Sequence, residues 1–416
     1  MTSARLDLGV GIVAVPGLDL MWEEIADLVD VVEIEPQTLW EVGAQTGWRL
    51  CGPAFSWLEQ LTKPKICHGV GFPVGGAEPP DPVGVTLAAT SARRLNAAHW
   101  SEHLSLNRTR IEGIPVEAGF LLPPLQTWAT VEAAAEHIAA YRRQLDLPFL
   151  IETGVNYLRP VPEELPDGDF IAHVVEQGDC GILLDLHNLW ANERNGRQSV
   201  SEVLAALPLE RILEVHLAGG FEIAGYYLDA HAGVIPGPLL NIASAVLPHL
   251  PNVRAVIYES LPEQLLSLGV AAVRGQLESL RRLLERPREA SDAGRGVPPC
   301  CLSRRRPATL RERADTIRWE RQFIQYTTHA TTRPPSDDPA FDLLRFLTDQ
   351  ARLGRIAAGN PHLLRKLVEE RGVVQAETVA ANYLHSCPAR LSTTDEANAF
   401  ATWLAASAAF DTTDGL

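Results

Sequence analysis

The chain has 416 residues, 46% of them hydrophobic, and a formal net charge of −16 at pH 7. Its length exceeds that of one average domain, so we expect a large domain and a smaller one, each with its own core. The acidic balance argues against a general nucleic-acid or anionic-membrane binder, because phosphate contacts need a dense positive surface.

The sequence shows no sign of a membrane segment or a targeting signal. No apolar run approaches the length needed to span a bilayer, and the start, MTSARLDLGVG, lacks the charged and hydrophobic regions of a signal peptide. We therefore expect a cytoplasmic protein. The six cysteines form no CxxC pair and no small-domain framework, which predicts reduced thiols.

Strand and helix signals alternate along the first two thirds of the chain. Short apolar runs predict strands at 6–13, 31–35, 65–69, 98–103, 148–152, 181–187, 211–217 and 254–259. Helical patterns lie between or after them at 21–29, 86–95, 130–145, 170–177, 200–207 and 264–285. Eight strands with mostly helical crossovers are the count of a (β/α)8 TIM barrel, although the alternation alone also fits an open doubly wound sheet.

The remaining third of the chain has a different pattern. A segment rich in Pro, Gly, Ser and Arg is typical of a linker, and the pattern after it is helical without strands. Asp338-Pro339 and Asn360-Pro361 have the pattern of helix starts. The predicted organisation is an α/β TIM-barrel catalytic domain at 1–285, a linker at 286–308 and a smaller all-α C-terminal domain at 309–416.

Histidine, carboxylate and amide side chains end most of the predicted strands. The pattern is densest in Gly181-Ile-Leu-Leu-Asp-Leu-His-Asn-Leu-Trp190, an apolar run followed by polar residues. The full set is His68, His103, Glu152, Asp185, His187, Asn188, His216, Asp229, His231 and Glu259. Polar residues at so many strand ends favour the closed barrel, because the carboxyl ends of barrel strands share one face whereas an open sheet has one switch point.

This set of side chains suggests a metal site. Imidazole and carboxylate together suit iron, zinc or manganese, and the near absence of cysteine argues against an iron–sulfur cluster. The candidates are too many for one ion, whereas two or three ions bridged by carboxylates would use them. Any one histidine or glutamate can instead be a hydrogen-bonded core residue or half of an ion pair. Burying the whole set without a metal would be costly.

Two local patterns refine the set. Glu102 and His103 are adjacent, so on a strand they point in opposite directions, and we assign His103 to the centre. Asp229 and His231 are two residues apart, which would place both side chains on one face of an extended segment.

The motifs resemble those of the multinuclear non-haem iron-dependent oxidative enzyme (MNIO) family, formerly DUF692, within the xylose-isomerase-like barrels. The resemblance covers about residues 7–270, and the order of so many motifs makes it specific. It is carried by Gly9-Val-Gly11, His68-Gly-Val-Gly71, Ser101-Glu-His-Leu104, Ile151-Glu152, Leu184-Asp-Leu-His-Asn188, His216-Leu-Ala-Gly219, Asp229-Ala-His231 and Ile257-Tyr-Glu259.

The resemblance implies a barrel with two or three Fe ions, a mixed-valent Fe(II)/Fe(III) pair and O2 as co-substrate, which modifies a residue, above all cysteine, in a ribosomally synthesised precursor peptide. Asp185 would be a ligand or a partner of one, and we assign it to catalysis together with His187. By motif the metal ligands would be His68, His103, Glu152, Asn188, His216, Asp229, His231 and Glu259.

The chain departs from the family pattern at two places. His187 stands where the family has asparagine, so a ligand is exchanged or a neighbouring hydrogen bond is altered. Thr153-Gly154 replaces the Asn-Val that follows the family's glutamate, which bears on how Glu152 is oriented.

Many family members work with a separate partner protein that helps to recognise the leader of the peptide. Residues 309–416 are a candidate for a built-in equivalent, and the alternative is a packing domain or an oligomer interface. An alternative function is a zinc- or manganese-dependent hydrolase or sugar isomerase of the same barrel superfamily, and another is a binding protein with a vestigial metal site. A requirement for O2 separates the first hypothesis from both.

Overall fold

The computed structural model describes residues 7–15, 17–43, 47–285, 305–329, 332–390 and 392–411. Most of the predicted linker, residues 286–304, lies outside the described residues. The proposed domain boundaries therefore stay a prediction.

The larger part of the chain is a closed barrel of eight parallel strands, as the sequence predicted. Around the barrel the order is β1, β2, β5, β6, β9, β10, β11 and β14, which is the order in the chain and the arrangement of a TIM barrel. The bounds are β1 (Gly9–Val13), β2 (Val31–Ile34), β5 (Lys65–Gly69), β6 (Trp100–His103), β9 (Phe149–Glu152), β10 (Gly181–Asp185), β11 (Ile212–Ala218) and β14 (Ala255–Glu259). The strands are buried almost throughout, because the helices cover their outer face.

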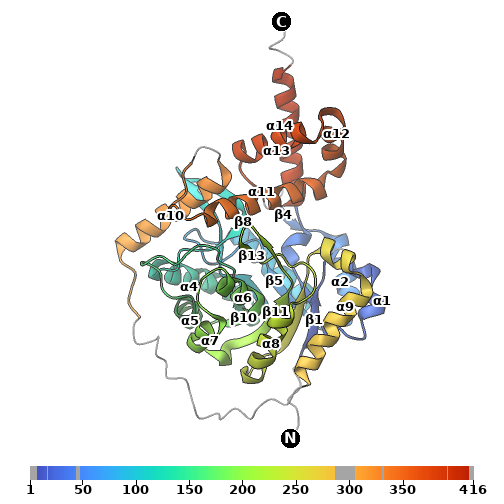
Figure 1. Cartoon of the computed structure of the whole chain (residues 1–416), viewed down its shortest axis with the longest axis vertical. Helices are drawn as coiled ribbons and strands as arrows, with labels where there is room; N and C mark the ends of the chain where they lie inside the picture. The colour runs from blue at the N-terminus through green and yellow to red at the C-terminus, as the bar shows by residue number, and fades with distance from the viewer. Residues whose placement is uncertain are drawn as a thin grey trace.

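Helices lie outside the barrel strands (Figure 1). They are α1 (Trp22–Ile25), α2 (Gly52–Gln60), α3 (Pro82–Leu95), α4 (Trp128–Arg142), α5 (Asp167–Gly178), α6 (Leu186–Arg194), α7 (Val200–Ala206), α8 (Gly237–Val246) and α9 (Pro262–Leu284). Short 3-10 turns are η1 (Leu18–Leu20), η2 (Pro36–Leu39), η3 (Leu209–Arg211) and η4 (Leu247–His249). N-terminal caps fix where several of these helices begin. The side chain of Asp81 accepts a hydrogen bond from a backbone N–H in the first turn of α3, and the side chain of Thr127 does the same for α4.

Three antiparallel hairpins were not predicted from the sequence. They are β3 (Trp40–Gly43) with β4 (Gly47–Leu50), β7 (Leu106–Ile111) with β8 (Ile114–Leu122), and β12 (Phe221–Ile223) with β13 (Tyr226–Leu228). Glu112-Gly113 and Ala224-Gly225 turn two of them, with positive φ at both residues of each turn. This is the backbone geometry that closes two-residue hairpins, but neither pair is the Asn-Gly or Asp-Gly that would have signalled it.

The strand predicted at 181–187 is shorter than expected, because Leu186 begins α6. The carboxylate of Asp185 accepts a hydrogen bond of 2.8 Å from the backbone N–H of Asn188, which satisfies a free donor in the first helical turn. His187 and Asn188 therefore lie in the first turn of a helix and not on the strand.

The C-terminal region is helical, without strands among its described residues, as predicted. Its helices are α10 (Leu310–Thr328), α11 (Ala340–Gly359), α12 (Pro361–Arg371), α13 (Val373–Ser386) and α14 (Thr393–Asp411). Phe323 of α10 and Phe341 of α11 share a hydrophobic core with Leu106 and Leu122 of the β7–β8 hairpin. Helices α11 to α14 enclose a second core around Tyr383 and Phe400. Figure 1 shows α12 to α14 farther from the barrel than α10 and α11.

The described cysteines Cys51, Cys67, Cys180 and Cys387 are free thiols. Burial raises the pKa of Cys67 and raises that of Cys180 to about 12, so both stay protonated and inert. Cys300 and Cys301 lie outside the described residues. Among the described helices, none combines the length and the apolar character that crossing a membrane requires.

A buried ion pair holds the outer helices together, and we expect Glu396→Gln to destabilise them. The Glu396 carboxylate accepts hydrogen bonds from Arg352 (2.8 Å) and from the Tyr383 hydroxyl (2.9 Å). Removing its charge leaves the buried guanidinium unpaired, which costs about 3–5 kcal/mol. Urea unfolding measures the change, and Glu370→Gln, at an exposed i,i+4 pair with Lys366, is the matched control that should leave the midpoint unchanged.

Candidate metal centre

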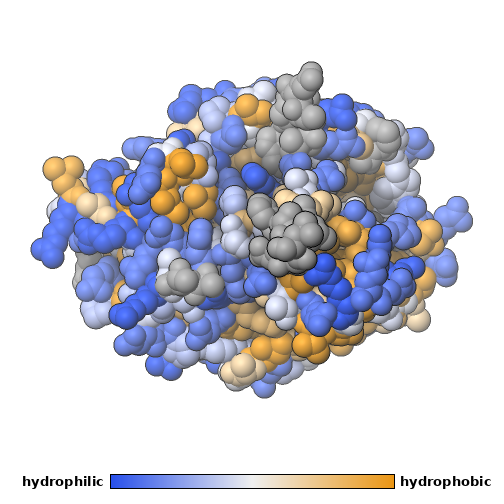
Figure 2. Space-filling model, turned by 90° about the horizontal axis from the view of Figure 1, so that it is seen from above, coloured by the Kyte–Doolittle hydropathy of each residue, from blue (hydrophilic) through white to orange (hydrophobic). Residues whose placement is uncertain are grey.

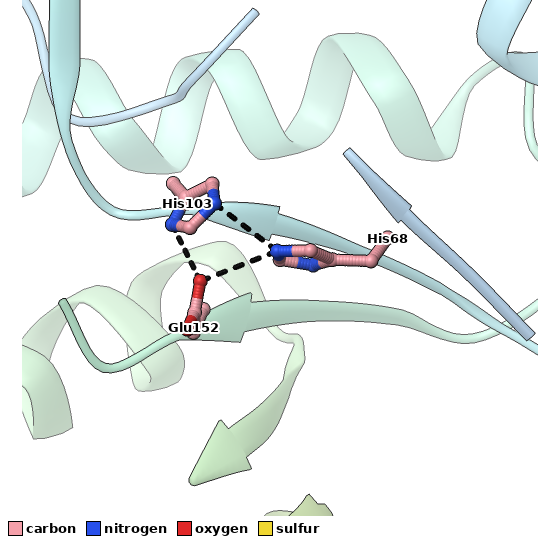
Figure 3. A group of neighbouring side chains, drawn as sticks. All are labelled: His68, His103 and Glu152. Atoms are coloured by element: carbon pink, nitrogen blue, oxygen red, sulfur yellow. Dashed lines mark hydrogen bonds and ion pairs between the residues drawn. The ribbon is translucent and has the colours of Figure 1, made fainter. Parts of the chain in front are cut away.

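Three residues from neighbouring strands form the first group of the candidate centre. His103 and Glu152 end β6 and β9, His68 is the last residue but one of β5, and the three side chains point toward one another (Figure 3). His103 Nδ1 lies 2.5 Å from Glu152 Oε2, and His68 Nε2 lies 3.4 Å from the same oxygen. One carboxylate oxygen and two imidazole nitrogens thus converge on one point, which is a donor set that suits a divalent transition metal.

A second group shares Glu152 with the first. Its members are Glu152, Asp185, His216 and Glu259, each with a ligand atom within 4.8 Å of the others, and all four are buried. His216 Nδ1 lies 3.1 Å from Glu259 Oε2. Because these residues belong to β9, β10, β11 and β14, the second group lies beside the first around the barrel.

Asp229, His231 and Asn188 extend the centre further. His231 Nε2 lies 2.9 Å from Asp229 Oδ1 and 3.3 Å from Glu259 Oε2, so Glu259 contacts the second group and this third one. The Asn188 amide donates to Glu152 Oε1 over 3.4 Å. The expectation of an extended segment at 229–231 is wrong, because His231 has a left-handed φ of 45° in the loop after β13, yet its ring still meets Asp229.

His187 lies against this third group with both ring nitrogens engaged. Its Nδ1 is 3.1 Å from Asp229 Oδ1 and its Nε2 is 3.3 Å from the Tyr227 hydroxyl. A Cβ at Gly220 would stand 2.8 Å from that Nε2, so glycine allows the close approach. The structure therefore brings all ten predicted residues together where the barrel strands end, and His187 supports Asp229 there.

Two buried polar atoms of the centre lack a hydrogen-bond partner. They are Asp185 Oδ2 and Asn188 Oδ1. A buried polar atom without a partner costs about 1–3 kcal/mol, and coordination to a metal would supply the missing interaction. Oxygen and imidazole donors of this kind fit iron, manganese or zinc, so the residues present suit the metal that the sequence motifs imply.

The electrostatics of the centre are those of carboxylates balanced by imidazoles. Burial alone would lower the pKa of His216 and His231, but the carboxylates around them, Glu33 and Asp229 foremost, hold both well above the usual range. Burial and the neighbouring Asp229 raise the pKa of Asp185 well above its usual range. A metal ion bound among these groups would displace their protons.

Sequence reasoning missed a buried layer beneath the centre. His216 Nε2 lies 2.9 Å from Glu33 Oε2, and His99 Nε2 lies 2.8 Å from Glu214 Oε2. Glu33 fixes the His216 ring so that Nδ1 faces Glu259, the kind of partner that orients a metal-binding histidine. The available signal was a glutamate inside the apolar run Val31-Val-Glu-Ile-Glu35, because a buried strand seldom carries a carboxylate without a partner.

Glu35 was also missed, although it follows the end of a barrel strand as several predicted residues do. Burial and the nearby Glu259 carboxylate raise its pKa to about 7, while His231 and His103 act in the opposite direction. The side chain is half-buried, in contrast to the fully buried Glu33. By contrast Glu102 faces away from the centre, where its carboxylate accepts a hydrogen bond of 3.2 Å from Tyr141.

A closed barrel with imidazole and carboxylate ligands at its strand ends defines a candidate metal-binding TIM barrel. The model of the family described as RiPP precursor modification enzyme MbnB/TglH/ChrH matches residues 16–260, and this places the chain in that family. RiPP precursors are ribosomally made peptides that enzymes modify after translation.

Three bacterial relatives, each called a UPF0276 protein, show how much of the chain is shared. The Streptomyces avermitilis relative is 31% identical over 228 residues, 53% of this chain and 45% of the relative. The Chromobacterium violaceum relative is 33% identical over 172 residues, 41% of this chain and 61% of the relative. The Shewanella loihica relative is 28% identical over 245 residues, 58% of this chain and 82% of the relative. The chain thus spans less than two thirds of the length of each of the first two relatives.

Solved structures with similar barrels are more distant. A xylose isomerase domain protein from Alicyclobacillus acidocaldarius aligns with a TM-score of 0.43 and 18% identity, covering 67% of this chain and 98% of that one. Endonuclease IV from Thermus thermophilus aligns with a TM-score of 0.41 and 18% identity, covering 66% of this chain and 98% of that one. Similarity at this level carries no argument about function.

We expect metal binding by this centre to strengthen as pH rises. His216 and His231 have raised pKa values, so both carry a proton at neutral pH in the absence of metal. A metal ion must displace those protons, and apparent affinity therefore falls as pH decreases. Titration with Mn²⁺ from about pH 6 to about pH 8 should show tighter binding at the higher pH. Affinity that is constant, or that falls over this range, contradicts the assignment.

Proposed function

We propose that the chain is a multinuclear non-haem iron enzyme that uses O2 to oxidise a residue, above all cysteine, in a ribosomally made precursor peptide. The observation that carries the proposal is the pair of shared carboxylates. Glu152 belongs to the first two ligand groups, and Glu259 contacts the second and the third. Carboxylates that serve two positions at once are what a cluster of two or three ions requires, since they offset the repulsion between cations.

The proposed iron positions follow the three groups. His68, His103 and Glu152 would hold one ion, and Glu152, Asp185, His216 and Glu259 the next. Asp229 and His231, with Glu259, would hold a third, and Asn188, whose amide contacts Glu152, would complete the second. Bound iron in mixed Fe(II)/Fe(III) states would supply O2 activation and electron transfer. In this proposal Asp185 is a ligand, and His187 acts through Asp229.

Exposure suggests the side from which a peptide reaches the centre. His103, Asp229 and His231 keep 14%, 14% and 20% of their side-chain surface exposed, whereas His68, Glu152 and His216 keep at most 1%. The half-buried Glu35 interacts with His103 and His231, and its pKa of about 7 lets it hold or release a proton near neutral pH. We propose that Glu35 accepts the proton of the substrate thiol at this edge.

Leader recognition is the role that we propose for the outer C-terminal helices. The end of the molecule that they form carries hydrophobic groups separated by hydrophilic side chains (Figure 2). Among the exposed apolar residues of α12 and α13 are Val368, Val373 and Val374. An exposed apolar side chain offers binding energy to a peptide partner, because its burial removes apolar surface from water.

We expect Val374→Glu to weaken binding of the precursor peptide, because a charge at the contact would have to be desolvated. Val374 is 75% exposed, so the substitution should not disturb folding. Val83→Glu is the matched control, since Val83 is 50% exposed on barrel helix α3. Fluorescence anisotropy with a labelled precursor measures the affinity. If Val374→Glu and the unaltered chain bind the precursor with equal affinity, leader recognition by α13 is contradicted, and α13 is a packing element.

The proposed chemistry predicts an O2-dependent mass change in a cysteine-containing precursor peptide. The peptide and anaerobically iron-loaded protein are mixed, O2 is admitted, and the product is followed by mass spectrometry. Glu152→Gln should lower turnover by more than about 100-fold, because losing a shared ligand exceeds the 10–100-fold effect of losing an outer partner. Glu59→Gln, at the α2 pair with Arg94, is the control and should keep full turnover.

Turnover that needs no O2, or that zinc or manganese supports as well as iron, would contradict the proposal. Such a result would favour the metal-dependent hydrolase or sugar isomerase.

A further inference from the structure

Helices α10 and α11 contact the loops that follow the ligand-bearing strands. The buried Glu320 carboxylate of α10 accepts a hydrogen bond of 2.9 Å from the backbone N–H of Ala77, in the loop after β5. Asp338, just before α11, accepts one of 2.7 Å from the backbone N–H of Arg159, in the loop after β9. Strands β5 and β9 carry His68 and Glu152, so the helices hold the loops that follow two of the ligand-bearing strands.

The β7–β8 hairpin, which follows the strand that ends in His103, is held in the same way. Arg355 of α11 donates a hydrogen bond of 2.5 Å to the carbonyl of Gly119. The hairpin also shares its hydrophobic core with Phe323 and Phe341. The hairpin is thus joined to α10 and α11 by a hydrogen bond and by a shared buried apolar core.

Tyr157 is the most direct link between these helices and a candidate ligand. Its ring is 3% exposed and lies in the hydrophobic core with Phe323, Phe341 and Leu344. Its hydroxyl oxygen accepts a hydrogen bond of 3.0 Å from the backbone N–H of Asp229. The ring therefore lies in the core to which α10 and α11 contribute, while the hydroxyl holds the backbone of the ligand.

The position of Asp229 depends on such outside support. Asp229 follows the short strand β13 and lies in no helix or strand of its own. Leu228, immediately before it, packs into the same core as Tyr157. The Asp229 carboxylate is in turn within 3.1 Å of His187 and 2.9 Å of His231, so a shift of its backbone would disturb the whole third group.

We propose that α10 and α11 are a structural part of the metal centre, and that Tyr157 is the positioning residue through which they hold Asp229. The inference rests on the proposed role of Asp229 as a metal ligand. It is separate from leader recognition, which concerns α12 and α13. It assigns to the inner C-terminal helices a function in metal retention that neither the motifs nor the family implies.

The test uses Tyr157→Phe in the full-length chain, which keeps the ring in its core and removes only the hydroxyl. Protein loaded anaerobically with iron(II) is dialysed against increasing chelator, and iron per chain is measured with Mössbauer spectra of an iron-57 sample. We expect the ion bound through Asp229 to be lost at about tenfold lower chelator concentration, the scale of losing an outer partner of a ligand. The signals of the remaining ions should persist.

A second pair of variants tests the helix side. Phe341→Leu loosens the core around Tyr157, whereas Phe400→Leu changes an equally buried ring in the separate core of α11 to α14. Only Phe341→Leu should weaken retention of the same ion and alter the same Mössbauer signal. Circular dichroism establishes that both variants are folded.

The outcomes distinguish this inference from the proposed function. An unaltered chain that takes up no iron overturns the metal centre and the inference with it. An unaltered chain that loads iron, with Tyr157→Phe and Phe341→Leu retaining it equally well, overturns the inference alone. Equal iron loss from Phe341→Leu and Phe400→Leu would mean that general stability governs retention, and would also overturn it.

Discussion

The structure depends on the burial of carboxylates and imidazoles where the barrel strands end. Glu152 and Glu259 each contact more than one ligand group, and both are nearly inaccessible to solvent. Buried charges of one sign cannot lie so close together without compensation, which either protons on the imidazoles or metal cations can provide. The proposed metal cluster is therefore a consequence of how the fold places these two glutamates.

Support for the ligands comes from inside and outside the barrel. Beneath the centre Glu33 contacts His216, and at the rim Tyr227 contacts His187, which in turn contacts Asp229. Such partners fix the orientation of a side chain that would otherwise have several rotamers. Our proposal for Tyr157 adds the inner C-terminal helices to this support, so that the barrel and those helices act on the centre as one unit.

Much of the barrel could be predicted from the sequence because its signals are local. Apolar runs such as Gly181–Asp185 end in polar side chains, and the helical patterns between them are long enough to recognise. The predicted strand was too long at that point because His187 continues the apolar-polar alternation, whereas the Asp185 cap starts a helix. Local pattern does not reveal such a cap in advance.

The parts that could not be predicted depend on contacts between distant residues. The β7–β8 hairpin has no strong turn signal, and its strands are completed by packing against α10 and α11. The bond from Ala77 to Glu320 joins residues 243 positions apart. Glu33 and Glu214 were missed because they lie within their strands, whereas the pattern that indicated ligands was a polar residue at a strand end.

The most direct test of the proposed centre is the metal content of anaerobically purified protein, measured by elemental analysis together with Mössbauer spectra of an iron-57 sample. We expect two or three irons per chain with coupled ferrous and ferric signals, as three ligand groups joined by Glu152 and Glu259 require. A single iron, or zinc or manganese alone with no gain of activity on reconstitution with iron, would contradict the proposed centre.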